Sequence, residues 1–337
     1  SAAINFAYNM MQETPQTLGE FVNETLENYM EQEPGTFVPL GEMHSEWEKT
    51  FNSGTHTAII CARGHLKTSW ALSTLAYHML THQNFRALYI SATLEQAWDK
   101  LEQFEELCRR SWRLSGMVKK KSSDDVGSWR KGAKYFNNGS RVHAASIGKA
   151  LEGPHVHMII LDDVLQEFPS ISDENVIHYI KRVVMPMRLP DERILLVGTQ
   201  KRVNDATDWV TESPQWNVVR HPALLEDETP RWPEYWTLER LEEEKYTMGS
   251  RAFESEYMLN PLDPESAVIP YEVLKPCLKE GMSMGLPESG DDWFVTMGVD
   301  LAVGMDSQND ESAYVVMAYN RVTEERKVLY CWSGKIR

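Results

Sequence analysis

The chain has 337 residues, which is longer than one average domain, so two domains are expected. Hydrophobic residues make up 42% of it and charged residues 25%, as in an ordinary globular protein, and no apolar run approaches the roughly 18 residues that a membrane span needs. The formal net charge of −16 argues against a protein that coats DNA permanently, because such binding neutralises many phosphates with basic side chains.

Predicted strands and helices alternate along the chain. Thr17 can cap a first helix, whose apolar residues recur at helical spacing between Leu18 and Tyr29. Further helices are predicted over 67–82 and 94–112, and the Asn138-Gly139 pair predicts a hairpin turn. Short apolar runs predict strands at 57–61, 86–91, 134–136, 141–144, 156–161, 193–197 and 216–220, the last as an edge strand. Such alternation implies an α/β fold, a parallel sheet flanked by helices on both faces.

A change of composition after about residue 258 indicates a domain boundary. Two stretches rich in Pro, Gly, Ser and Asp, at 260–265 and 281–292, have the composition of a linker. New β patterns follow at 294–299, 312–319 and 327–331. The predicted parts are an N-terminal, partly helical segment (1–50), an α/β domain (51–258), a linker (259–292) and the beginning of a second domain (293–337).

The cysteines and the first residues indicate a reducing compartment. The four cysteines lie far apart and form no C-x-x-C pair, which indicates neither a zinc site nor a disulfide framework. The opening residues SAAINFAYNM lack the basic region and apolar core of a signal peptide. The cytosol fits best.

The segment Cys61-Ala62-Arg63-Gly64-His65-Leu66-Lys67-Thr68-Ser69 lies between a predicted strand and a predicted helix. In that position a phosphate loop binds ATP with backbone N–H groups and a helix N-terminus. Lys67 would reach the β- and γ-phosphates, Thr68 would hold Mg²⁺, and Arg63 would add charge at the γ-phosphate. The predicted ATP-binding residues are Arg63, Gly64, His65, Leu66, Lys67, Thr68 and Ser69. The match to G-x-x-x-x-G-K-[ST] is imperfect, and an ordinary strand-to-helix turn is the alternative.

The apolar run 158–161 ends in the acidic pair Asp162-Asp163. In ATPases of this kind the first acid holds Mg²⁺ and the next acts on the attacking water. Asp162 would therefore be a metal ligand and Asp163 the catalytic residue, together with Lys67 and Arg63. Two acids that cap the turn after a strand are the alternative.

Two further features carry weaker predictions. The strand at 194–197 ends in Gly198-Thr199-Gln200, small and polar residues that can sense the γ-phosphate. A basic stretch runs from Arg109 to Arg141. It is either a DNA contact or the solvated face of a helix and its loop.

The ordered set of motifs resembles the large subunit of tailed-phage terminases over roughly residues 36–320. It comprises His44-x-x-Trp47, ARGHLKTS, YISATLEQA, NNGSRV, LEGPHVHMIILDD, LLVGTQ, YMLNP and GVDLAVGMDS. The resemblance implies an ASCE-type P-loop NTPase domain followed by an RNase H-like nuclease domain. It also implies that Arg63 contacts the γ-phosphate and that Gly198-Thr199 is the coupling motif. Trp47 would lie near the adenine, although a structural tryptophan is the alternative.

The function implied by the resemblance is ATP-driven translocation of double-stranded DNA into a procapsid. The implied partners are DNA, ATP, Mg²⁺, a portal protein, a small terminase subunit and further copies of the chain in a ring of five. No membrane partner is expected, and the host cytoplasm would be its location.

Three departures from the family pattern stand out. Leu66 replaces a common Gly, and Asp163 stands where Glu is more usual. Many relatives carry an Arg at the position of Glu152, which can act across a subunit boundary. Here such a residue must come from elsewhere, and the candidates are Arg141, Arg202 and Lys149.

The predicted strand ending at Asp300 matches the first strand of an RNase H-like nuclease, whose acids share two metal ions. Asp306 and Asp310 resemble turn residues more than the missing ligands. We therefore expect an incomplete nuclease site, with no nuclease activity in this chain, as in a fragment of a longer protein.

Two other functions fit parts of the pattern. A superfamily-2-like helicase or other DNA-remodelling ATPase shares the phosphate loop and the acidic strand but needs a second motor domain. A non-catalytic DNA-binding scaffold with a decayed loop would explain Leu66. The joint presence of Arg63, Lys67, Thr68, Asp162 and Asp163 argues against decay.

Overall fold

The computed structural model describes residues 17–30, 37, 39–118, 131–149, 155–165, 171–202, 205–261, 292–301 and 312–334. The chain divides into two compact units, residues 1–266 and 267–337, which are described separately below. Within the described residues, no helix has the length and apolar character needed to cross a membrane.

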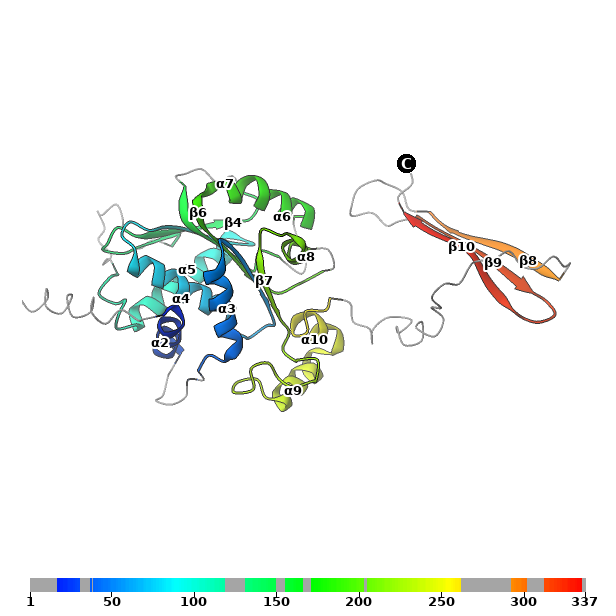
Figure 1. The fold of residues 1–337 in the computed structure, drawn as a ribbon, viewed down its shortest axis with the longest axis horizontal. Helices are drawn as coiled ribbons and strands as arrows, with labels where there is room; N and C mark the ends of the chain where they lie inside the picture. The colour runs from blue at the N-terminus through cyan, green and yellow to red at the C-terminus, as the bar shows by residue number, and fades with distance from the viewer. Residues whose placement is uncertain are drawn as a thin grey trace, which may run out of the picture. The chain divides into compact units, whose positions relative to one another are not determined.

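Unit 1 is built on a seven-stranded sheet with the order β3-β4-β2-β5-β6-β1-β7 (Figure 1). All neighbouring strands are parallel except β3 and β4, which form the hairpin predicted from Asn138-Gly139. The strands are β1 (His56–Cys61), β2 (Arg86–Ser91), β3 (Ala133–Tyr135), β4 (Arg141–Ser146), β5 (Val156–Asp162), β6 (Arg188–Gly198) and β7 (Asn217–His221). Strand β7 lies at the edge, as predicted, and the predicted α/β fold is confirmed.

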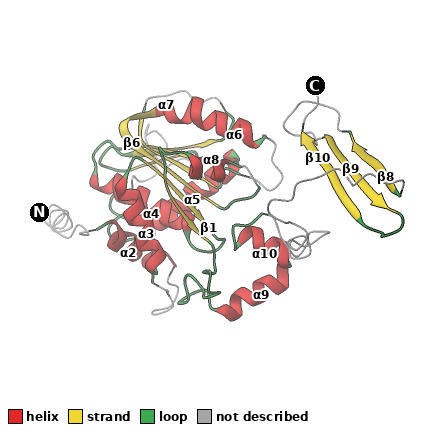
Figure 2. Ribbon diagram, turned by 45° about the vertical axis from the view of Figure 1, so that its right-hand side comes forward, coloured by secondary structure: helices red, strands yellow, loops and turns green. Residues whose placement is uncertain are grey.

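Helices cover both faces of this sheet (Figures 1 and 2). One face carries α2 (Leu18–Met30), α3 (Glu42–Ser53), α4 (Lys67–Thr81) and α5 (Leu94–Arg110). The other carries α6 (Asp173–Tyr179), the π-helical turn η1 (Ile180–Val184), α7 (Met185–Met187) and α8 (Ala206–Glu212). Strand β1 shows why the sequence allows this: Ile59 and Cys61 join the core on the first face, and Ala58 and Ile60 the core on the second. Such a strand is apolar throughout because alternate side chains enter different cores.

The ends of α2 and α5 follow the predicted capping chemistry. The hydroxyl oxygen of Thr17 accepts from the backbone N–H of Glu20, and the Glu20 carboxylate accepts from the backbone N–H of Thr17. Thr93 and Gln96 form the same reciprocal pair at the start of α5. These bonds satisfy N–H groups that have no partner within the helix.

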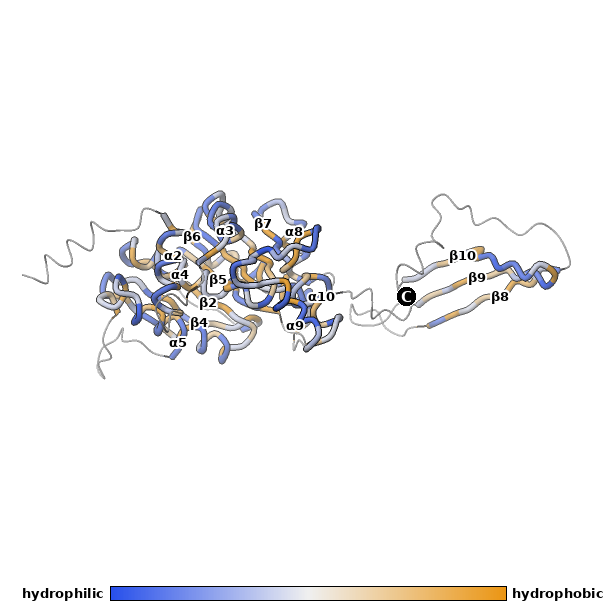
Figure 3. Tube along the Cα trace, turned by 90° about the horizontal axis from the view of Figure 1, so that it is seen from below, coloured by the Kyte–Doolittle hydropathy of each residue, from blue (hydrophilic) through white to orange (hydrophobic). Residues whose placement is uncertain are grey.

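The N-terminal helices belong to the same core as the sheet. Phe21, Val22 and Leu26 of α2 and Phe51 of α3 are buried in one cluster with residues of β1, β2 and β5. Figure 3 shows hydrophobic residues gathered inside unit 1, between the helices, with hydrophilic residues outside. Burial of this apolar surface is the main source of stability for such a fold.

A small third cluster lies beside the phosphate loop. Helices α9 (Leu238–Met248) and α10 (Ser250–Glu256) contribute Leu241 and Phe253, which pack with Tyr257, Ala223 and Ala62. Ala62 directly follows β1, so this cluster brings the last described segment of unit 1 to the start of the loop.

The described part of unit 2 is a three-stranded antiparallel sheet with the order β10-β9-β8. Its strands are β8 (Trp293–Asp300), β9 (Ser312–Asn320) and β10 (Arg326–Gly334), which confirms the three predicted strands. The predicted linker, 259–292, lies largely outside the described residues. The domain boundaries and the RNase H-like fold of this part stay predictions.

Candidate nucleotide-binding site

The predicted phosphate loop connects the end of β1 at Cys61 to the start of α4 at Lys67. Two backbone bonds hold its beginning: Ala62 N–H donates to the carbonyl of His221 (3.0 Å), and Arg63 N–H to the carbonyl of Glu256 (2.9 Å). Gly64 has a φ of +75°, a conformation that L side chains rarely adopt. The loop leads into a 15-residue helix, whose first N–H groups have no partner within the helix and point toward an anion.

Leu66 adopts the left-handed conformation, with φ 63° and ψ 17°, immediately before α4. This is the position where the general pattern has Gly, and the structure gives the reason: the turn into the helix needs a positive φ. An L side chain in this region costs roughly 1–2 kcal/mol. The Leu66 side chain packs against the main hydrophobic core, which offsets part of this cost. The departure therefore keeps the turn but introduces backbone strain.

The start of α4 and the end of β5 meet across the sheet. The Thr68 hydroxyl donates to Asp162, with Oγ1 3.0 Å from Oδ1 and 3.2 Å from Oδ2. Strand β6 lies between β1 and β5, so the loop and the acidic pair are brought together although their strands are not neighbours. A hydroxyl and a carboxylate side by side are the oxygen donors that Mg²⁺ accepts in a site completed by water and phosphate, so these residues fit the predicted ion.

Asp162 is fully buried. Burial, followed by the neighbouring charge of Asp163, raises the pKa of Asp162 to about 6. The hydroxyl of Tyr89, on the adjacent strand β2, donates to Asp162 Oδ2 at 2.5 Å. Burial also raises the pKa of Tyr89 well above its ordinary value, so this hydroxyl keeps its proton and acts as a donor. The motif search did not identify Tyr89, because a tyrosine inside an apolar strand gives no signal of its own.

Asp163 lies at the mouth of the loop, opposite Lys67. Lys67 Nζ is 4.0 Å from Asp163 Oδ1, and the side chains are 10% and 46% exposed, respectively. Asp163 has a φ of 45°, and its N–H donates to the carbonyl of Val197. Its carboxylate passes close to the α-carbon of Gly198, since a β-carbon added there would be 3.8 Å from Asp163 Oδ1. The second acid of the pair therefore faces solvent between the loop lysine and the end of β6.

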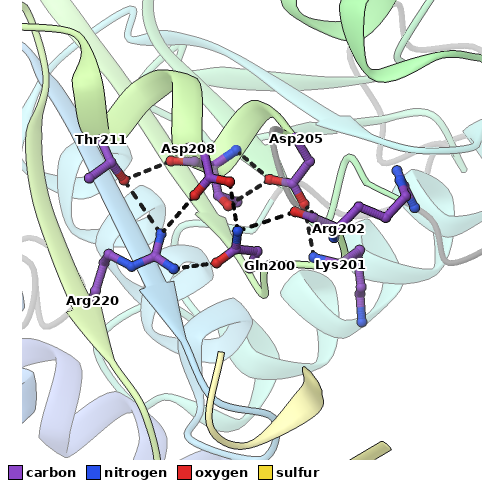
Figure 4. Close-up of polar contacts among 8 residues, drawn as sticks. Gln200, Lys201, Arg202, Asp205, Asp208, Thr211 and Arg220 are labelled. Atoms are coloured by element: carbon purple, nitrogen blue, oxygen red, sulfur yellow. Dashed lines mark hydrogen bonds and ion pairs between the residues drawn. The ribbon is translucent and has the colours of Figure 1, made fainter. Parts of the chain in front are cut away.

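The predicted coupling residues follow directly after this contact. The Thr199 hydroxyl donates to the carbonyl of Cys61, which ties the end of β6 to the start of the loop at 3.0 Å. Gln200 is almost fully buried and bridges two elements (Figure 4): its amide N–H donates to Asp208 of α8, and its carbonyl accepts from Arg220 of β7. Movement of the β6 end would thus be transmitted to α8 and β7.

The residues after Gln200 form a tight turn around Asp205 (Figure 4). The Asp205 carboxylate accepts from the backbone N–H groups of Lys201, Arg202 and Thr207. Lys201 Nζ is 2.5 Å from Glu256 Oε1, at the end of α10. The coupling segment and the phosphate loop are therefore joined to the same residue, since the Glu256 carbonyl accepts from Arg63 N–H.

The candidates for an arginine acting across a subunit boundary differ in their surroundings. Arg202 makes two hydrogen bonds to Asp173, of 2.7 and 2.5 Å, and would have to leave this partner. Lys149 is exposed, and Arg141 is half-buried on β4. Glu152 lies outside the described residues. Arg63 is exposed at the loop, and it forms no ion pair with another described residue.

The expectation that Trp47 contacts the adenine is wrong for this structure. Its ring is fully buried, and its indole N–H donates to His221 Nδ1 at 2.9 Å. His221 in turn donates to Glu46, and its carbonyl accepts from Ala62 N–H. His44, in the same motif, accepts from Gly41 N–H and bonds through Nε2 to the carbonyl of His65. The motif supports the phosphate loop from behind, which is the structural alternative.

His65 occupies the inner side of the loop. Its side chain is fully buried, and its Nδ1 bonds to the carbonyl of Arg63 at 2.9 Å. Burial lowers the pKa of both His44 and His65 to about 4, so both rings are neutral at pH 7. Only the backbone of His65 is thus available to a phosphate.

Most of the described part of the basic stretch has acidic partners within the chain. The pairs are Arg109–Glu105 (2.7 Å), Arg110–Glu106 (2.7 Å), Arg113–Glu24 (2.9 Å) and Lys134–Glu105 (2.6 Å). The Lys134 side chain is only 3% exposed. These pairs favour the structural alternative over a DNA contact for these four residues, whereas 119–130 lie outside the described residues.

Asp300 stands at the end of β8, opposite Ala313, and is exposed. Asp306 and Asp310 lie outside the described residues. Across the described ranges, no group of three or more His, Cys, Asp or Glu side chains is arranged to hold a metal ion. The predicted nuclease role of Asp300 stays a prediction.

Comparison with known proteins finds similarity at the level of structure. No protein-family model and no curated protein sequence matches the chain. The crystal structure of the bacteriophage HK97 large terminase is similar with a TM-score of 0.52 and 17% identity, over 94% of this chain and 68% of that one. Two others are the large terminase ATPase domain of Thermus phage P74-26 (TM-score 0.47, 13% identity, 67% and 95% covered) and the large terminase of a thermophilic bacteriophage in complex with ADP (0.41, 10%, 94% and 68%). The chain has the fold of the HK97 large terminase.

Proposed function

We propose that the chain is the ATP-hydrolysing motor subunit of a tailed-phage terminase, which drives double-stranded DNA into a procapsid. The observation that carries this proposal is the meeting of two sequence-distant pairs: Lys67 and Thr68 at the start of α4, and Asp162 and Asp163 at the end of β5. The fold shared with the HK97 large terminase supports the assignment to genome packaging.

Each part of the site has a role in ATP hydrolysis. The loop N–H groups and Lys67 bind the phosphates. Thr68 and Asp162 would hold Mg²⁺, which when bound neutralises charge on the β- and γ-phosphates. Asp163, partly exposed beside Lys67, orients the attacking water and accepts its proton. Arg63 adds positive charge at the γ-phosphate.

The result of hydrolysis passes to the DNA-facing parts through the end of β6. Gly198 lies against Asp163, and Thr199 and Gln200 connect the loop, α8 and β7. A change at the γ-phosphate thus alters contacts that reach three elements. In the assembled motor we expect a ring of five chains on a portal, with a small terminase subunit, in the host cytoplasm. A residue of the neighbouring chain would complete the site.

The two alternatives receive less support. A helicase-like ATPase needs a second parallel motor sheet, whereas the described strands of unit 2 pair antiparallel. A non-catalytic scaffold does not need the contacts from Thr68 to Asp162 and from Lys67 to Asp163, which are made despite Leu66.

The first experiment is phosphate release from ATP with Mg²⁺, with and without double-stranded DNA. Lys67→Ala is compared with wild type and with Lys181→Ala, which removes a lysine that lies over Trp209, on the other face of the sheet. We expect turnover in wild type and Lys181→Ala, stimulation by DNA, and loss of turnover in Lys67→Ala. Equal turnover in Lys67→Ala would refute the loop assignment.

A further inference from the structure

Tyr89 is buried in the middle of the sheet, and its hydroxyl has a charged partner there. The residue lies on β2, in register with Ile160 of β5, two residues before Asp162. Its side chain is fully buried, and its hydroxyl donates to Asp162 Oδ2 at 2.5 Å. A buried hydroxyl needs a hydrogen-bond partner, and a short bond to a carboxylate is among the stronger ones.

The Asp162 carboxylate is held from two sides. Tyr89 lies on the sheet side, at Oδ2, and the Thr68 hydroxyl lies on the loop side, 3.0 Å from Oδ1. The rotation of an aspartate carboxylate about its last bond is otherwise broad, so one donor alone would not fix its plane. With Tyr89 at Oδ2, Oδ1 is directed toward Thr68 and the start of α4.

We propose that Tyr89 is a positioning residue for magnesium, which fixes the orientation of the Asp162 carboxylate so that Oδ1 faces the ion. This inference rests on the proposed ATPase function and extends it to a residue outside the motifs. Groups that hydrogen-bond a metal ligand set its orientation, and their loss typically lowers metal affinity or activity by 10- to 100-fold.

The test separates this role from a purely structural one. A structural role would alter stability, or nucleotide binding with and without the metal. A positioning role alters only the dependence on Mg²⁺. Tyr89→Phe removes the hydroxyl and keeps the ring that fills the core. Tyr179→Phe is the matched control, since the Tyr179 hydroxyl also makes an internal bond, to the carbonyl of Lys149 at 2.6 Å.

The experiment titrates MgCl₂ into the whole chain with a fluorescent ADP analogue and reads anisotropy, with an EDTA sample as the metal-free baseline. For Tyr89→Phe we expect the half-saturating Mg²⁺ concentration to rise about 10-fold, with analogue binding in EDTA unchanged. Tyr179→Phe should match wild type. Circular dichroism and the melting temperature of each variant report folding independently.

Three outcomes would overturn the inference, and they can be told apart. An identical Mg²⁺ curve in Tyr89→Phe and wild type means that the bond does not position the carboxylate, and the proposed function stands. Weaker binding in EDTA as well means that Tyr89 supports the loop rather than the carboxylate. If wild type binds no analogue at any Mg²⁺ concentration, the proposed function fails, and the inference fails with it.

Discussion

The indole N–H of Trp236 donates to the carbonyl oxygen of Gly64 at 3.2 Å. The same ring stacks on His65, with centroids 5.8 Å apart, and a β-carbon added at Gly64 would lie 2.5 Å from its Cζ2 atom. Trp236 lies 172 residues after Gly64 in the chain, in the segment that precedes α9. One aromatic side chain thus holds the phosphate loop in place from outside its own motif.

Trp236→Phe should weaken ATP binding. The change keeps an aromatic ring against the loop but removes the donor to Gly64, a bond worth about 0.5–1.5 kcal/mol, which corresponds to a rise of roughly 2- to 10-fold in the dissociation constant. Isothermal calorimetry with ATP and Mg²⁺ measures it. Trp112→Phe, at a ring that is 42% exposed, is the control. An unchanged dissociation constant in Trp236→Phe would contradict the holding role.

Replacing Leu66 tests the backbone strain at the loop. Leu66→Gly and Leu66→Ala both lose the packing of the side chain, but only Gly relieves the left-handed backbone at φ 63°. We expect the Gly variant to exceed the Ala variant in free energy of unfolding by about 1 kcal/mol. Urea denaturation measures both. Equal stabilities would mean that the turn does not require a positive φ.

Asp163→Asn should keep nucleotide binding and lose turnover. The amide preserves shape and the contact with the loop but cannot accept a proton from water, which costs typically 10²–10⁴-fold in rate. ATP binding and phosphate release are measured on the same samples. Asp191→Asn is a matched control, because Asp191 is an exposed acid near the start of β6, far along the strand from Gly198. Normal turnover in Asp163→Asn would assign the water to another residue.

His78→Phe should remove part of the acid sensitivity of the fold. Burial lowers the pKa of His78 to about 3, and the ring stacks on Phe85 with its Nε2 unbonded among the described residues. In the unfolded chain His78 takes up a proton near pH 6.5, whereas in the folded chain it does not until about pH 3. Stability is therefore present above pH 6.5 and is lost as the pH falls.

From pH 6.5 to 5 the loss attributable to His78 is roughly 2 kcal/mol. Urea denaturation at both pH values should show a smaller difference in His78→Phe than in wild type. Exposed His143 provides a control, since His143→Phe leaves the buried ring in place. The same pH dependence in His78→Phe and wild type would contradict the burial argument.

Asp300→Asn should leave ATP turnover unchanged. Asp300 lies on β8 of unit 2, whereas every residue placed in ATP hydrolysis lies in unit 1. Phosphate release with and without DNA is the measurement, and Lys67→Ala serves as the inactive reference. A large loss of turnover would mean that Asp300 does not belong to a separate site.

The sequence by itself determined the secondary structure and the local parts of the site. Strand β1, the loop and α4 are continuous in the chain, so an apolar run followed by Lys67-Thr68 could be interpreted without any partner. The acidic pair at the end of β5 was identified for the same reason. Period-two and helical patterns reflect burial on particular faces, which is why the strands and helices of the sheet were predicted nearly at their observed bounds.

Only the tertiary structure decided what lies behind and around these parts. Trp47 bonds to His221, 174 residues away, and Trp236 to Gly64, so the support of the loop depends on contacts that no local pattern encodes. Tyr89 has the pattern of any buried strand residue, and its role arises because β2 and β5 are paired in a particular register. The basic stretch was ambiguous for the same reason: its partners, such as Glu24, come from distant helices. Local sequence determines dihedral preferences and burial, whereas side-chain partners are determined only when the strands pair and the helices pack.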